Sequence, residues 1–192
     1  MAKFFDSIPN PLRRMVERQR IFFVATAADG ARVNVSPRPT AETLRITGPN
    51  ELIYLDMTGS GAETAAHLKA DGRMTVMFCS FEEQPMIVRF FGTGRSVFKG
   101  TEEYQTLLDT HFDGKELPGA RQIVVQTIEQ AQSSCGYGVP FFDYTGERST
   151  LKDWSTRKGD AGIAEYLEEK NLVSQDGLPT GFEEVAEALQ RP

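Results

Sequence analysis

A strand, a glycine loop, a short helix and a second strand are predicted within residues 51–78, and this stretch limits the possible folds more than any other. Leu52–Leu55 and Met74–Phe78 are short apolar runs of the kind that form strands. Residues 58–61 interrupt the pattern with two glycines, and residues 63–70 have helical character. The fold must therefore bring together two strands that are joined by a loop and a short helix.

The glycine loop carries groups that suit an anion. Thr58, Ser60 and Thr64 offer hydroxyls, and Gly59 and Gly61 let a ligand approach the backbone closely. Free N–H groups at the start of the following helix can bind a phosphate or a carboxylate. The loop lacks both the Lys-Ser/Thr ending of a P-loop and the full spacing of a dinucleotide fingerprint. Two interpretations remain, an anion site and a capped turn without a ligand.

The rest of the chain favours β structure with a few helices at the periphery. Gly92 and Gly94 predict a bulge or sharp bend in one strand. Short turns join the strands, and regular crossover helices do not separate them, which favours a small antiparallel barrel over a doubly wound sheet. Further strands are predicted at residues 21–26, 32–38, 44–46, 86–91, 94–98 and 121–128, and helices at residues 101–112, 162–171 and 182–189 and near the N-terminus, ending at about residue 19.

The predicted strand at residues 32–38 alternates in character. Val33 and Val35 would face one side, with Asn34 and Ser36 on the other. Prolines at positions 37 and 39 would end its pairing with a neighbouring strand. This strand can therefore present polar side chains to a ligand.

Composition excludes several classes of protein. At 192 residues the chain fits one domain, and its 40% hydrophobic and 25% charged residues are ordinary for a globular protein. A net charge of -6 argues against a broad nucleic-acid surface. There is no apolar run of about 18 residues and no leader-like N-terminus. We therefore expect a cytoplasmic protein that binds neither nucleic acid nor membrane.

The cysteines and histidines suggest no metal site and no nucleophile. Cys79 and Cys135 lie far apart and outside any metal-ligand spacing, so we expect two reduced thiols. His67 and His111 are the only histidines, and neither accompanies a Ser or Cys in a catalytic pattern. We expect His67 to be a packing or surface residue of the short helix.

Taken in order, several segments resemble the FMN-binding split-barrel family related to pyridoxamine 5'-phosphate oxidase. They cover about two thirds of the chain, and their order and spacing carry the resemblance more than any single motif does. The segments are FFVATA at 22–27, RVNVSPR at 32–38, YLDMTGSGAETAAHL at 54–68, GRMTVMF at 72–78, IVRFFGTGRSV at 87–97 and SCGYGVPFFDY at 134–144.

The resemblance implies a fold, a cofactor and a partner. The family fold is a six-stranded antiparallel split β-barrel, here expected over residues 1–150, with residues 151–192 as a helical tail packed on the same domain. Family members are homodimers that hold FMN in clefts between the subunits. We therefore expect a homodimer with FMN at its interface.

The resemblance also assigns the phosphate end of the flavin. Arg38 falls where the family has a basic residue, and Thr58, Ser60, Gly61 and Thr64 of the glycine loop region would complete the site. Without the resemblance, a solvated charge at the barrel edge would be the favoured role of Arg38.

One phosphate-binding cation or more is missing from the family pattern. The biosynthetic oxidase has a Ser-Arg-Lys run where this chain has Ala62-Glu63-Thr64. Arg89 and Arg95 are candidates to replace it. For Arg89, which lies within an apolar strand, the alternative is an ion pair with a buried carboxylate.

The ring end of the flavin is assigned in the same way. The backbone of Val33, Asn34, Val35 and Ser36 matches the segment that edges the isoalloxazine in the family, and the side chains of Asn34 and Ser36 could hydrogen-bond the ring. Tyr144 matches an aromatic residue that closes over the flavin from the partner subunit. Packing at the subunit interface is the alternative role for this tyrosine.

The function implied is that of an FMN-dependent oxidoreductase with an unassigned substrate. The biosynthetic oxidase itself is disfavoured, because its substrate-binding Arg-Leu-His segment is not reproduced: Arg148 is followed by Ser149, Thr150 and Leu151. Two alternatives stay open, a flavin-binding protein without turnover and a split barrel that binds a deazaflavin coenzyme. Haem ranks last because the chain has two histidines.

Overall fold

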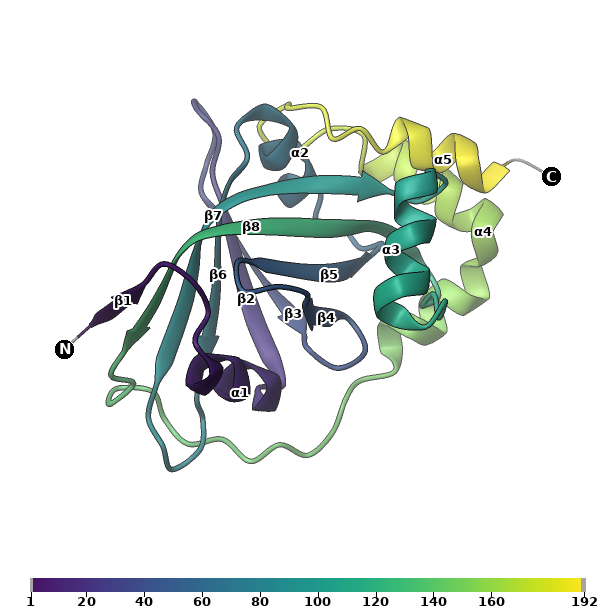
Figure 1. The fold of residues 1–192 in the computed structure, drawn as a ribbon. Coiled ribbons are helices and arrows are strands. Elements are labelled where there is room, and N and C mark those ends of the chain that lie inside the picture. Colours follow the sequence, from purple (N-terminus) through teal and green to yellow (C-terminus); the bar gives the residue numbers. More distant parts are fainter. Residues whose placement is uncertain (1, 191–192) are drawn as a thin grey trace.

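The computed structural model describes residues 2–190, whose centre is one curled sheet of antiparallel strands (Figure 1). The strand order along the sheet is β3-β2-β6-β7-β8-β5-β4, and β1 pairs with β8 beside this path. The strands are β1 (Lys3–Phe5), β2 (Ile21–Thr26), β3 (Asn34–Pro39), β4 (Leu44–Ile46), β5 (Glu51–Met57), β6 (Arg73–Cys79), β7 (Ile87–Phe98) and β8 (Ala120–Ser134).

The mainly β architecture with peripheral helices is confirmed, but the described sheet has eight strands where six were expected. The sequence did not predict β1, because three residues are too few to show a period. The segments predicted at 86–91 and 94–98 form one bent strand, β7, with the predicted bulge between Phe91 and Gly92. A side chain at position 92 would meet the Thr127 carbonyl, so this bulge requires glycine.

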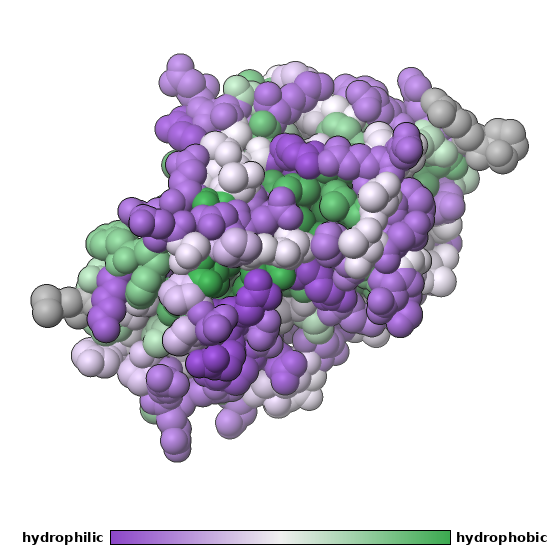
Figure 2. Space-filling view, in the orientation of Figure 1, coloured by the Kyte–Doolittle hydropathy of each residue, from purple (hydrophilic) through white to green (hydrophobic). Residues whose placement is uncertain are grey.

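The barrel core lies inside the curled sheet. Phe22, Val24, Phe78 and Phe90 are fully buried there, and the rings of Phe22 and Phe78 stack 5.8 Å apart. Figure 2 shows that the face in view is mostly hydrophilic, with small hydrophobic areas between polar side chains. Hydrophobic burial inside the barrel therefore holds the sheet curled.

The apolar run in β5 is continuous because both faces of this strand are buried. Leu52 and Tyr54 point into the barrel core, whereas Ile53 and Leu55 belong to a second cluster on the outside, with residues of the helix α3 (Glu102–Phe112). A strand covered on both faces loses the period-2 alternation of a half-exposed one.

The remaining helices close the ends of the barrel. Leu12, Met15 and Val16 of α1 (Asn10–Arg18) join the barrel core. The short helix α2 (Glu63–Ala70) follows the glycine loop, and α4 (Thr150–Lys170) and α5 (Glu183–Gln190) pack against it. Residues 135–149 form an irregular strap, which runs along the lower edge of the barrel in Figure 1 from β8 to α4.

The barrel is split between β3 and β5. Of the described strands, β3 pairs with β2 alone, and β4 covers β5 only at residues 52–54. The far end of β5 therefore faces β3 without an intervening strand, next to the glycine loop. The candidate site lies at this opening.

Candidate functional site

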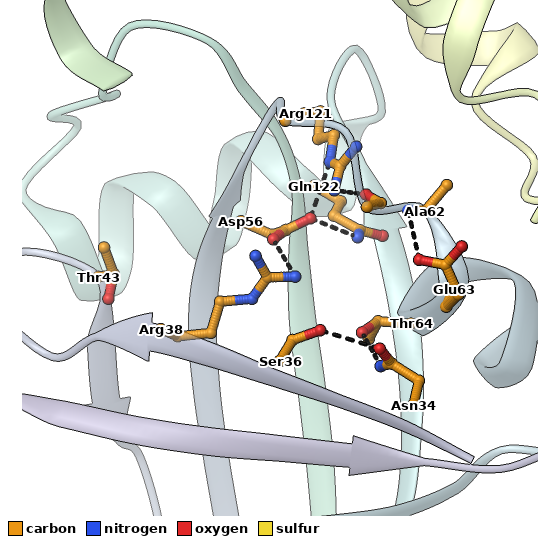
Figure 3. Close-up of polar contacts among 12 residues, drawn as sticks. Asn34, Ser36, Arg38, Thr43, Asp56, Ala62, Glu63, Thr64, Arg121 and Gln122 are labelled. Atoms are coloured by element: carbon orange, nitrogen blue, oxygen red, sulfur yellow. Dashed lines mark hydrogen bonds and ion pairs between the residues drawn. The ribbon is translucent and has the colours of Figure 1, made fainter. Parts of the chain in front are cut away.

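The polar face of β3 points into the split, as predicted for Asn34 and Ser36 (Figure 3). Ser36 Oγ donates to Asn34 Oδ1 at 3.0 Å. Asn34 Nδ2 lies 3.2 Å from Thr64 Oγ1, at the start of α2, and 3.2 Å from Thr26 Oγ1. The structure thus shows that β3 contacts the helix after the glycine loop. From the sequence, only the family resemblance placed these two elements at the same site.

A buried histidine continues this hydrogen-bond network. His67 Nδ1 lies 3.0 Å from Thr26 Oγ1, and both side chains are buried. His67 Nε2 is also buried and has no partner among the described residues. His67 is therefore a core residue that hydrogen-bonds within this network. Its burial rules out the alternative that it is a surface residue of the short helix.

Arg38 reaches across the split to a buried carboxylate. Arg38 Nη2 lies 3.0 Å from Asp56 Oδ1 of β5, with the Arg38 side chain 22% exposed and that of Asp56 1% exposed. Arg121 of β8 binds the other oxygen, with Nε 2.8 Å from Asp56 Oδ2, and Gln122 Nε2 donates to the same oxygen at 2.8 Å. Two guanidinium groups share one carboxylate, so the cluster carries one net positive charge.

Burial and charge act in opposite directions on this cluster. Burial alone would raise the pKa of Asp56, but Arg121 and Arg38 outweigh it, so that the pKa lies below its ordinary value. Burial would likewise lower the pKa of Arg38, whereas Asp56 raises it, and the net shift is upward. Asp56 and Arg38 are therefore charged at neutral pH, and because a guanidinium group does not lose its proton in proteins, the excess positive charge persists.

The glycine loop is tied down from behind. Arg121 Nη2 donates to the Gly61 carbonyl at 2.7 Å, and Asn171 Nδ2 donates to the Gly59 carbonyl at 3.1 Å. The Thr58 N–H donates to the Gly119 carbonyl at 2.7 Å. The loop nevertheless stays accessible from its other side, because Ser60 and Gly61 are exposed.

The first turn of α2 has no side-chain cap, which argues against the interpretation of the loop as a capped turn. Its acidic residue folds back instead: Glu63 Oε2 accepts from the Ala62 N–H at 3.1 Å. Thr58 Oγ1 is buried and has no hydrogen-bond partner among the described residues. The Glu63 carboxylate thus shows that an N–H group of this loop can bind an anion.

Three expected groups lie away from this cluster. Val33 and Val35 point outward, 71% and 60% exposed, so only their backbone borders the split. Arg89 is half-buried on β7, and within the described residues its side-chain hydrogen bond is to Ser134 Oγ, at 3.4 Å. No buried carboxylate of the described chain pairs with Arg89.

Tyr144 lies in the strap. Arg20 is placed over its ring at 5.1 Å, and its hydroxyl donates to Glu147 at 2.7 Å. With Phe23, Phe81 and Phe142 these residues line a groove of about 510 Å³. A role of Tyr144 toward a partner's flavin stays a prediction.

Sequence reasoning missed Asp56, Arg121 and Asn171. The first two are single charged residues in otherwise apolar strands, LIYLDM and ARQIVV, and a charge in such a run is a signal of a buried partner. Asn171 carried no such signal, because its role depends on the tertiary contact between the helical tail and the glycine loop.

Residues 2–190 support neither a metal site nor a membrane-spanning helix. These residues hold no group of three His, Cys, Asp or Glu side chains arranged for a metal ion, and Cys79 and Cys135 are free. None of the described helices combines the length and the apolar character needed to cross a bilayer.

Two comparisons by sequence find relatives of the chain. A family model described as pyridoxamine 5'-phosphate oxidase matches residues 8–135. The pyridoxamine 5'-phosphate oxidase family protein ustO of Aspergillus flavus is 35% identical over 196 residues, which cover 93% of this chain and 78% of that protein.

Two solved structures are similar at lower identity. A HupZ variant from Group A Streptococcus has a TM-score of 0.51 at 16% identity, covering 66% of this chain and 99% of its own, and it supports the fold alone. An FAD-binding protein from Mesorhizobium loti has a TM-score of 0.46 at 14% identity, covering 70% of this chain and 99% of its own.

Proposed function

The chain belongs to the pyridoxamine 5'-phosphate oxidase family, and on that premise we propose that it binds FMN at the split and acts as an FMN-dependent oxidoreductase. The observation that carries this proposal is the net positive charge of the Arg38–Asp56–Arg121 cluster beside an open glycine loop. In an oxidoreductase of this kind, the bound flavin would carry out the hydride or electron transfer. The residues of the chain supply binding and orientation.

The residues of the split fit the phosphate end of FMN. The flavin phosphate is an anion that needs cations and hydroxyl or amide donors. Arg38 is the partly exposed cation of the cluster, Thr58 has a buried hydroxyl without a hydrogen-bond partner in residues 2–190, and Ser60 is exposed on the loop. A Cβ at Gly59 would meet no atom within 4 Å, so the loop leaves space for a ligand.

The edge of β3 suits the ring end of FMN. An edge strand presents unpaired N–H and C=O groups, which can match the donors and acceptors along the isoalloxazine edge. β3 is such an edge over Asn34–Pro39. Its side-chain network from Ser36 through Asn34 to Thr64 holds the strand against α2 and so fixes the position of this edge.

A homodimer forms part of the proposal. Phe23 and Met77 are cross-strand partners on the outer face of the sheet, and Phe23 lies next to Pro37 of β3, the strand on which Val35 is exposed. Apolar side chains on an outer sheet face favour burial against a second copy.

The test is an absorbance spectrum of the purified protein before and after addition of FMN and removal of the excess. Bands at roughly 370 and 450 nm that stay with the protein are expected for bound flavin. A colourless protein that retains no FMN would contradict the proposal. Anaerobic NADH or NADPH should then bleach the 450 nm band, whereas a bound flavin that stays oxidised would indicate binding without turnover.

A further inference from the structure

The turn after α4, residues 171–180, packs against the back of the glycine loop, and we name it the C-terminal clasp. Its first residue, Asn171, is fully buried. Asn171 Oδ1 accepts from Arg121 Nη1 at 3.3 Å, and Asn171 Nδ2 lies 3.1 Å from the Gly59 carbonyl and 3.5 Å from the Ser60 carbonyl. One amide side chain therefore connects the charged cluster to two carbonyls of the loop.

These contacts determine which way the peptide groups of the loop point. In a trans peptide the C=O and the following N–H point in opposite directions, and the described chain has no cis peptide. The carbonyls of residues 59, 60 and 61 face donors behind the loop, from Asn171 and Arg121. The N–H groups of residues 60, 61 and 62 consequently face the other side, where consecutive amides form an anion-binding concavity.

The clasp also contacts the start of α2 and the residue two positions before β3. The Gln175 N–H donates to Glu63 Oε1 at 3.3 Å, and the Arg32 N–H donates to Asp176 Oδ2 at 2.8 Å. Thr180 Oγ1 donates to the Asn171 carbonyl at 2.7 Å and holds the clasp closed on itself. The clasp thus spans the start of α2 and the approach to β3.

Packing of the helical tail does not depend on the Asn171 side chain. Ile163, Leu167, Phe182 and Val185 form an apolar cluster with Ala62 and Ala65, and this cluster already attaches the tail to α2. The Asn171 amide places its donors on the loop carbonyls. The hydrogen bonds of the Asn171 side chain therefore act on the conformation of the glycine loop.

We propose that Asn171 is a positioning residue that orients the amides of the glycine loop toward the phosphate of a bound flavin. This inference rests on the flavin binding proposed above. It assigns to the helical tail a role in selecting phosphorylated over unphosphorylated flavin, with no direct contact between Asn171 and the ligand.

FMN and riboflavin separate this role from a general loss of structure, because they share the ring and differ in the phosphate. We would measure the dissociation constant of each for the native protein and for Asn171→Ala by quenching of flavin fluorescence. Loss of one hydrogen-bonded anchor should weaken FMN binding about tenfold. Riboflavin binding should change by less than about twofold.

Two further variants complete the test. Asn171→Leu keeps the side-chain volume and the net charge of the cluster, loses the hydrogen bonds to Arg121 and Gly59, and should weaken FMN selectively even where the alanine variant fails to fold. Gln190→Ala removes a side-chain hydrogen bond to Glu168 within the helical tail, away from the loop, and should leave both affinities unchanged. Equal weakening of both flavins by the Asn171 variants, or no change in either, would overturn the inference. A native protein that binds neither flavin would instead overturn the proposed function.

Discussion

Arg38 Nη2 and Asp56 Oδ1 lie 3.0 Å apart across the split of the barrel, and they join two strands that share no backbone hydrogen bonds. Because Arg121 binds the other oxygen of Asp56, this carboxylate neutralises only part of the charge around it. The same contact thus holds the opening together and leaves a positive charge for an anionic ligand.

Replacement of Asp56 by asparagine should destabilise the fold at neutral pH. Loss of the carboxylate leaves two guanidinium groups close together, one of them fully buried, and breaking a buried ion pair costs about 3 kcal/mol. Urea denaturation measures the difference in the free energy of unfolding. Glu103→Gln is a matched control, because it breaks the exposed pair with Arg95 and should cost about 0.5 kcal/mol or less. Equal costs for both variants would contradict a special role of Asp56.

The contribution of Asp56 should depend on pH in a defined direction. Its pKa is lower in the folded state than the ordinary value of 3.8, so its stabilisation is fully present above that value. The stabilisation is lost as the pH falls through the folded pKa. The difference between the native protein and Asp56→Asn in urea denaturation should therefore be constant from pH 7 to about 5 and shrink below about 4. A difference that grows on acidification would contradict this assignment.

Arg38→Ala should weaken FMN binding while the protein stays folded. Asp56 keeps its contacts with Arg121 and Gln122, so the carboxylate is not left unpaired. Loss of a charge-assisted contact with a phosphate should raise the dissociation constant of FMN about 30-fold. Arg38→Lys should restore part of the affinity, because it restores the charge without the planar fork.

The control for Arg38 is Arg95→Ala, which removes an arginine that pairs with Glu103 on the outside of the barrel. Its FMN affinity should equal that of the native protein. If both alanine variants weakened FMN binding equally, the cause would be the changed net charge of the protein and not the loss of a contact at the split.

Much of this arrangement was predictable from the sequence, for identifiable reasons. The runs IFFVAT and LIYLDM predict strands because apolar side chains must be buried, and Gly92 and Gly94 within a strand pattern predict a bulge, which the structure places between Phe91 and Gly92. Val33 and Asn34 alternate, so the pattern placed them on opposite faces. Local pattern thus fixed the elements and the face of β3 that meets the split.

The partners of the site residues were not predictable in the same way. Arg38 was assigned to a phosphate, and although a charge in LIYLDM indicates a buried partner, no sequence pattern identifies Arg38, 18 positions earlier on a different strand, as the partner of Asp56. Arg121 and Asn171 reach the glycine loop from 60 and 112 positions away. Such contacts depend on how the sheet curls and where the tail packs, and single-sequence periodicity carries no information on either.

Glu63→Gln should tighten FMN binding. The Glu63 carboxylate accepts from the Ala62 N–H, one of the amides expected to face the phosphate, and it repels a second anion. Its removal should lower the dissociation constant of FMN about three- to tenfold at low salt, less at high salt, and leave that of riboflavin unchanged.

Glu102→Gln is the control for Glu63, because Glu102 occupies the first turn of α3 in the same way but lies away from the glycine loop. Glu102→Gln should cost about 0.5 kcal/mol of helix stability, and Glu63→Gln should cost more, because the Glu63 side chain also accepts from the N–H groups of Ala62 and Gln175. Weaker FMN binding by Glu63→Gln would show that the carboxylate supports the loop and does not compete with the phosphate.

Val35→Lys should disrupt the proposed homodimer. Val35 is 60% exposed on the outer face of β3, and a charge there would be buried without a partner if a second copy covered this face. Light scattering should give a dimer for the native protein and a monomer for the variant at micromolar concentration. Leu151→Lys places the same charge at an exposed apolar position of α4 and should leave the dimer intact. Because the flavin clefts are expected between subunits, Val35→Lys should also retain less FMN, and a monomeric native protein that binds FMN fully would contradict the shared cleft.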